Sequence, residues 1–194
     1  MGWLNNHSPV REITLGLFFG VLSLIFNAIV QINLPGISEA SSDFREIPLI
    51  MGVFFYRKWF PIAVSCVITT FTFYNYGPDV YVSVFINHFI ALLSAWYFYR
   101  YLRKLNLSYT LLAISWSGMA IVYYVVFLFP LLSAYEIFYL RDTTPFFKHL
   151  GALIDVGKVE VILTTLITSS FSVALETRRK LEEANDNLEL VVNQ

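Results

Sequence analysis

Long apolar runs separated by short polar breaks are the feature that most limits what this chain can fold into. Hydrophobic residues make up 57% of the 194 residues and charged residues only 14%, against about 25% charged residues in soluble domains. So few charges cannot cover the surface of a soluble core, and the longer runs reach the roughly 20 apolar residues that cross a bilayer. The sequence therefore predicts an all-α integral membrane protein.

Six apolar segments lie between the breaks. We predict membrane-spanning helices at about 13–34, 44–56, 59–76, 80–101, 109–140 and 153–175. The second segment is short, so we expect it to be re-entrant, tilted or partly buried in protein. Pro130 should kink the fifth, because proline removes a helical hydrogen bond.

Lysine and arginine are unequally divided between the two ends of these segments. The larger group consists of Arg11, Arg57, Lys58, Arg100, Arg103, Lys104 and Arg178–Lys180, and the smaller of Arg45, Arg141 and Lys148. Positively charged loops stay on the cytoplasmic side. We therefore expect both termini in the cytoplasm and the connections 35–43, 77–79 and 141–149 outside.

The segment after the sixth span is polar and contains no glycine or proline. Leu181 and Leu188 are seven residues apart, and Asn185 lies between them at the other core-type position of a heptad. A solvated helix end is one interpretation. The pattern favours the other, a cytoplasmic coiled coil of a parallel homodimer that continues the last span over 176–194.

Polar side chains inside the predicted spans are candidates for a binding site, because each is costly in the bilayer unless it has a partner. Most of them fall in the outer half of the bundle. They include Asn27, Gln31, Asn87, His88, Glu136 and Tyr139. Hydrogen bonding between helices would explain any one of them, whereas their shared depth suggests a polar cavity that opens outward.

A charged cluster stands at the start of the second span. Asp43 is placed to cap the N-terminus of that helix. Arg45 should then point into the outer half of the bundle, where one of three carboxylates, Glu46, Glu136 or Asp155, could pair with it. Arg45 is our first candidate for contact with a ligand that carries an acidic or carbonyl group, and Asp43 and Glu46 also belong to the candidate site.

No catalytic motif is recognisable in the chain. It contains no glycine-rich phosphate loop, no HExxH and no Gly-x-Ser-x-Gly elbow. His7, His88 and His149 lie on separate segments, and the single Cys66 lies in an apolar run, so neither a metal site nor a disulfide is expected. We predict a chain that is not an enzyme, with no cofactor and no nucleic-acid partner.

Between Ile32 and Gly52 a Pro-Gly pair is followed by an Asp-x-Arg-x-x-Pro sequence that begins at Asp43. This stretch resembles the LytS/YhcK-type multi-transmembrane sensor domain of bacterial receptors. In that family the first span ends in Pro-Gly, and a short loop leads to an Asp-x-Arg-x-x-Pro helix start followed by small residues. The matching residues here are Pro35, Gly36, Asp43, Arg45, Pro48 and Gly52. The polar tail is similar to the linkers that precede kinase or cyclase output domains.

The resemblance implies the sensory input domain of a bacterial histidine kinase, as in two-component systems, or of a diguanylate cyclase in the inner membrane. Residues 1–175 would bind a small ligand in an outward-facing cavity, and 176–194 would begin the signalling linker. Since the family is related in architecture to the substrate-binding subunits of vitamin transporters, such a subunit is the alternative. A purely structural membrane anchor is a third possibility, which the outward polar cluster disfavours.

Overall fold

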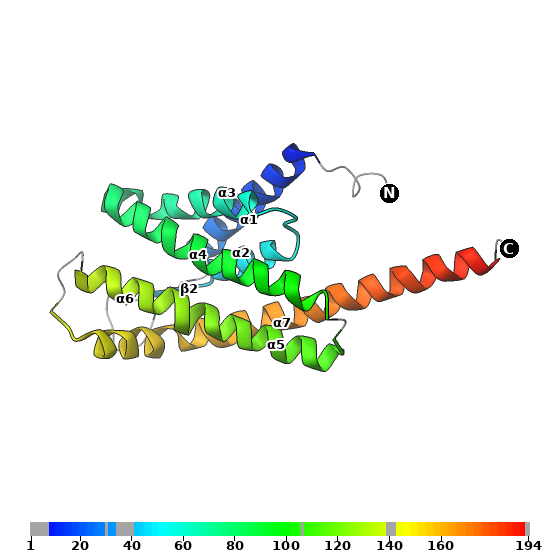
Figure 1. Cartoon of the computed structure of the whole chain (residues 1–194). Coiled ribbons are helices and arrows are strands. Elements are labelled where there is room, and N and C mark those ends of the chain that lie inside the picture. The colour runs from blue at the N-terminus through cyan, green and yellow to red at the C-terminus, as the bar shows by residue number, and fades with distance from the viewer. Residues whose placement is uncertain (1–7, 30, 34–40, 106, 139–142, 193–194) are drawn as a thin grey trace.

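The computed structural model describes residues 8–29, 31–33, 41–105, 107–138 and 143–192. They form a helical bundle with one short two-stranded ribbon (Figure 1). The elements, in chain order, are α1 (Pro9–Ile29), β1 (Gln31–Asn33), β2 (Ser41–Asp43), α2 (Glu46–Val53), α3 (Phe60–Thr70), the 3-10 helix η1 (Phe71–Tyr76), α4 (Pro78–Leu102), α5 (Tyr109–Val122), the π-helical segment η2 (Tyr123–Leu128), α6 (Phe129–Phe138) and α7 (Phe146–Val192). The helical fold expected from the sequence is confirmed.

Three helical stretches are long and apolar enough to cross a membrane. They are Pro9–Ile29, Pro78–Leu102 and Tyr109–Ala134, and a shorter apolar helix covers Phe60–Phe73. The three correspond to the first, fourth and fifth predicted spans. Their length and composition are compatible with a membrane protein.

The second predicted span is a short helix enclosed by the bundle. Helix α2 has eight residues and is therefore about 12 Å long. All of its residues except Met51 are buried. Of the three possibilities expected for this short segment, the structure shows burial in protein. In a bilayer, the non-helical backbone next to α2 would be tolerable only where protein surrounds that backbone, because lipid cannot supply its hydrogen-bond partners.

The ribbon before α2 corrects two sequence-based expectations. The first helix ends at Ile29 rather than near Leu34, and the chain then forms β1. Strand β2 pairs with β1 in antiparallel register, with Asp43 opposite Gln31. Because this pairing holds Asp43 in a strand and α2 begins only at Glu46, with Arg45 at its N-cap position, the predicted role of Asp43 as the helix cap is wrong.

Helices α1 and α3 pack closely because α1 carries two glycines four residues apart. A Cβ atom on Gly16 would lie 2.7 Å from the carbonyl oxygen of Pro61, and one on Gly20 would lie 2.8 Å from the Ile68 Cβ. One turn further on, the Thr69 hydroxyl donates to the Ser23 hydroxyl at 3.1 Å. Small residues at this spacing allow the close approach that is common between membrane helices.

The fifth predicted span is one helical rod with an irregular middle. The π-helical segment η2 joins α5 to α6 directly, and Pro130 lies just beyond it. Proline lacks the N–H that would bond to the carbonyl four residues earlier, at Val126, and Val126 lies inside η2. The sequence predicted a kink at Pro130, and the structure shows a π-helical segment that ends two residues before this proline.

Helix α7 has 47 residues, which makes it about 70 Å long. It begins at Phe146 rather than near Leu153, so Lys148 and His149 belong to its first turn. Its N-terminal half packs along α5 and α6, and its C-terminal part projects from the bundle (Figure 1). Leu181 and Leu188 lie on this projecting part and are 65% and 64% exposed.

The basic residues of the connections gather at the end of the bundle from which α7 projects. The Arg57 amide donates to Glu12 at the start of α1, at 3.1 Å, and the Arg100 guanidinium donates to the Arg57 carbonyl at 3.4 Å. The Lys180 ammonium lies 4.7 Å from the centre of the Tyr109 ring. The grouping of these basic turns at one end, expected from the sequence, is therefore present in the fold.

Candidate functional site

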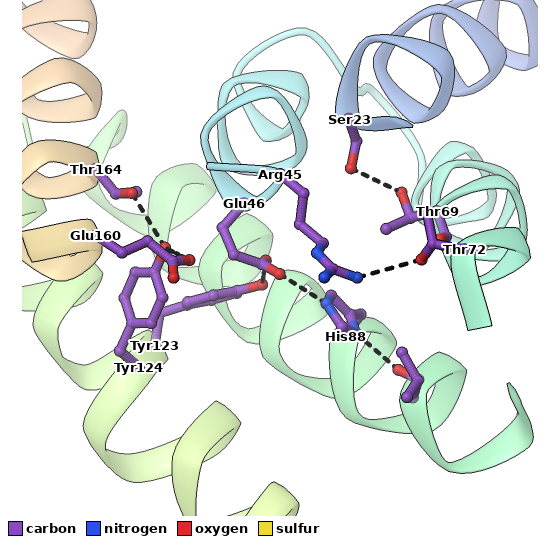
Figure 2. Close-up of polar contacts among 11 residues, drawn as sticks. Ser23, Arg45, Glu46, Thr69, Thr72, His88, Tyr123, Tyr124, Glu160 and Thr164 are labelled. Carbon is purple, nitrogen blue, oxygen red and sulfur yellow. Dashed lines mark hydrogen bonds and ion pairs between the residues drawn. The ribbon is translucent and has the colours of Figure 1, made fainter. Parts of the chain in front are cut away.

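A buried polar cluster joins α2, α4 and η2 in the middle of the bundle (Figure 2). Glu46, the first residue of α2, is only 2% exposed. Its Oε1 lies 2.7 Å from His88 Nε2, and its Oε2 accepts a hydrogen bond from the Tyr123 hydroxyl. The other ring nitrogen of His88 lies 2.8 Å from the carbonyl oxygen of Val84. Both oxygens of the carboxylate and both nitrogens of the imidazole therefore have partners.

The geometry limits where the protons of this cluster reside. The Val84 carbonyl can only accept a hydrogen bond, so Nδ1 of His88 carries a hydrogen. The contact between His88 Nε2 and Glu46 then needs one more proton. It sits either on the imidazole, giving an ion pair, or on the carboxyl group, giving a neutral pair. In both forms the pair has no net charge, as its burial requires.

Arg45 lies beside this cluster and faces η1. Its Nη1 donates to the Thr72 hydroxyl at 3.3 Å, and its guanidinium lies 4.7 Å from the centre of the Phe73 ring. Of the carboxylates expected near Arg45, Glu46 is adjacent in sequence and is hydrogen-bonded by His88 and Tyr123. Asp155 is exposed and pairs with Lys158 at 3.7 Å, so its predicted pairing with Arg45 is wrong.

The next tyrosine connects the same region to α7. The Tyr124 hydroxyl donates to Glu160 Oε1 at 2.9 Å and lies 3.0 Å from the Thr164 hydroxyl. Figure 2 shows that the two tyrosines extend from η2 toward different carboxylates, Tyr123 toward Glu46 and Tyr124 toward Glu160. One π-helical turn therefore holds both α2, through Tyr123, and α7, through Tyr124. Segments of this kind are frequent at functional sites.

A cavity of about 180 Å³ opens beside these residues. Its polar wall consists of Arg45, Glu46, His88 and Glu160, and its apolar wall consists of Phe73, Val84, Leu128, Phe129, Leu132, Leu153, Val156 and Gly157. A Cβ atom on Gly157 would lie 2.5 Å from Cζ of Phe129, so a larger residue there would have to displace that ring. The cavity is smaller than the roughly 300–1,000 Å³ of drug-sized sites, so it suits a molecule of few non-hydrogen atoms.

Three predicted site residues, Arg45, Glu46 and His88, come together at this cavity. Asn87 is buried next to His88 but does not line the cavity, and its Nδ2 has no hydrogen-bond partner within the part of the chain that the structure describes. Asn27, half-buried on α1, is also not among the lining residues. Four predicted site residues remain. Tyr139 lies outside the described residues, and the structure does not describe the side chains of Gln31, Asp43 and Glu136.

The sequence-based candidates omitted the partners on η2 and α7. Tyr123, Tyr124 and Glu160 complete the hydrogen bonding, and Glu160 also lines the cavity. A signal for Glu160 was available, since an ionisable residue about four turns inside a largely apolar helix marks a functional position. Nothing in the sequence distinguishes the two tyrosines from others in the spans, because their role depends on which way η2 faces.

No group of histidine, cysteine and acidic residues suited to a metal ion occurs among the residues that the structure describes. The side chains around the cavity offer hydrogen-bonding and charged groups. No protein-family model, curated protein or solved structure matches this chain, so the function proposed below rests on the resemblance already described and on the geometry of the site.

Proposed function

We propose that the chain is the membrane-embedded sensory input domain of a bacterial receptor, of the kind that precedes a histidine kinase or a diguanylate cyclase. One observation carries the proposal. The cavity beside Glu46 is walled by Leu153, Val156, Gly157 and Glu160 of α7, and α7 continues without interruption to Val192. A ligand in the cavity would thus touch the helix that leaves the bundle.

The cavity suits a small carboxylate. The Glu46–His88 pair contributes no net charge in either protonation form, so the remaining charges of the wall are those of Arg45 and Glu160, and a ligand carboxylate would bind to Arg45. Arg45 donates to the Thr72 hydroxyl at 3.3 Å, and a carboxylate ligand would add bidentate, charge-assisted bonds to the planar guanidinium. The leucines of the opposite wall would cover the aliphatic part of such a molecule.

Signal transfer would run through α7 into a dimeric coiled coil. Leu181 and Leu188 are exposed on the projecting part of the helix, as expected of a seam that a second copy covers, with Asn185 at the core position between them. The end of the bundle that carries most basic residues would face the cytoplasm. With six crossings, the second made by the ribbon and α2, both termini would lie on that side of the inner membrane.

The first experiment tests binding. The purified protein is heated in detergent with a panel of amino acids and short mono- and dicarboxylates. A ligand present at 100 times its Kd stabilises by about 2.7 kcal/mol, so at least one carboxylate should raise the Tm. Arg45→Ala should remove the effect and Arg45→Lys restore it partly, because lysine lacks the planar fork. Lys148→Ala, which removes an exposed cation that does not line the cavity, serves as the control.

The second experiment tests signalling. Residues 1–194 are fused in heptad register to a histidine-kinase output domain, and autophosphorylation is measured with the carboxylate that binds. Wild type should respond and Arg45→Ala should not. If no carboxylate stabilises the protein, or Arg45→Ala is stabilised equally, the ligand assignment fails. Binding without any change in phosphorylation would favour a transporter-type substrate-binding subunit instead.

A further inference from the structure

A second and larger cavity lies where α7 leaves the bundle. It has a volume of about 330 Å³, within the roughly 300–1,000 Å³ typical of ligand sites. Figure 1 shows α4, α5 and α7 converging at this end of the molecule. The C-terminal ends of α2 and α4, the start of α5 and the stretch of α7 from Ser172 to Glu182 form its walls.

The interior of this cavity is apolar. Phe54, Leu102 and Leu112 line it and are buried, and Phe55, Leu107 and Leu175 add half-buried apolar surface. Two lining residues, Tyr99 and Ser172, carry hydroxyls, and the Ser172 hydroxyl already donates to the Ser169 carbonyl at 2.7 Å. The six apolar side chains of the interior suit a hydrocarbon chain.

The rim of the same cavity is basic. Three arginines line it against two glutamates. Arg179 is held by Glu176 and Glu183, and Arg178 pairs with Glu182 in an exposed contact at 2.8 Å. Arg103 is different, because it makes no ion pair with any residue in the described ranges and lies 5.9 Å from the centre of the Tyr99 ring. An anion at the rim would find Arg103 available and Arg178 only weakly engaged.

We propose that this cavity binds an anionic phospholipid, with one acyl chain in the apolar interior and the phosphate at Arg103 and Arg178. The cavity lies at the ends of apolar helices, at the depth where headgroups meet protein, and basic pockets between helices at this level bind anionic lipids. A free phosphate ion would leave the apolar interior in contact with water. Since α7 forms one wall, the lipid would brace the point from which that helix projects.

The proposal is independent of the ligand cavity beside Glu46 and needs only that the bundle resides in a membrane. Native mass spectrometry of the purified chain in detergent tests it, with dioleoylphosphatidylglycerol, dioleoylphosphatidylcholine and inorganic phosphate as probes. We expect one phosphatidylglycerol bound per chain, no comparable binding of phosphatidylcholine, and no competition by inorganic phosphate.

Three variants locate the site. Arg103→Gln should weaken phosphatidylglycerol binding about tenfold or more, because a charge-assisted bond is lost. Lys104→Gln removes the same charge from an exposed neighbour that does not line the cavity, and should change binding less than about twofold, since solvent screens it. Leu107→Trp keeps every charge but fills the interior, and should also abolish binding.

If Arg103→Gln and Lys104→Gln weaken phosphatidylglycerol binding equally, the binding depends only on general surface charge and the proposal is overturned. Equal binding of phosphatidylcholine would also overturn it, and so would competition by inorganic phosphate, which would indicate a site for a free anion. If Leu107→Trp does not fold, the comparison of the two lipids on wild type and on Arg103→Gln still decides the question.

Discussion

Replacing Tyr123 by phenylalanine removes a single hydroxyl group from the middle of the bundle. The Tyr123 side chain is fully buried, and its hydroxyl donates to Glu46. A hydrogen bond to a charged group contributes about 1.5–3 kcal/mol, whereas hydrogen bonds between membrane helices contribute about 0.6 kcal/mol on average and at most about 1.7. The two ranges overlap near 1.5 kcal/mol, and we expect the free energy of unfolding to fall by about that amount.

Glu46→Ala should cost more. It leaves Nε2 of His88 and the hydroxyl of Tyr123 buried without their hydrogen-bond partner, and breaking a buried pair in this way costs about 3–5 kcal/mol. The double variant Glu46→Ala/Tyr123→Phe should cost no more than Glu46→Ala alone, because phenylalanine has no hydroxyl that requires the carboxylate.

Thermal unfolding in detergent, followed by tryptophan fluorescence, measures these effects. A chain of this length loses about 2–4 °C of Tm for each kcal/mol, so Tyr123→Phe should lower the Tm by about 3–6 °C and Glu46→Ala by roughly 6–20 °C. The control is Tyr97→Phe on the same bundle, where the tyrosine is 62% exposed, and its Tm should change by less than about 2 °C.

Two results would refute this reasoning. Additive losses in the double variant would mean that the Tyr123 hydroxyl and Glu46 do not interact in the protein. A loss for Tyr123→Phe no larger than that for Tyr97→Phe would mean that the hydroxyl contributes nothing to the packing of η2 on α2.

Three further predictions concern packing, assembly and topology. Gly16→Ala should lower the Tm, because its Cβ would meet the Pro61 carbonyl oxygen at 2.7 Å, whereas Gly118→Ala, with nothing within 4 Å, should leave the Tm unchanged or raise it. Leu181→Lys with Leu188→Lys should abolish cross-linking between two tails while the Tm of the bundle stays constant, and unchanged cross-linking would argue against the heptad seam. A reporter active only in the periplasm should be silent when fused after residue 194 and active when fused after Gly77, and the reverse pattern would contradict the proposed orientation.

The apolar runs alone were sufficient to predict helices, their approximate order and the grouping of the basic turns. The reason is local: in an apolar environment a backbone must satisfy its own hydrogen bonds, and a helix does so within one segment. The same kind of reasoning identified α2 as short. It also selected Arg45, Glu46 and His88, since each is a polar group that the bilayer penalises.

Which of these groups meet was decided by tertiary packing. Glu46 and His88 are 42 residues apart, and Glu46 and Tyr123 are 77 apart, so their contacts depend on how three helices are rotated about their axes. Asp43 looked like a helix cap because only its neighbours in sequence were considered, and its pairing with Gln31 across the ribbon prevailed. Tyr124 and Glu160 became partners because η2 turns one tyrosine toward α2 and the next toward α7. A periodicity in one segment carries no information about the rotation of another, and here that rotation determines the site.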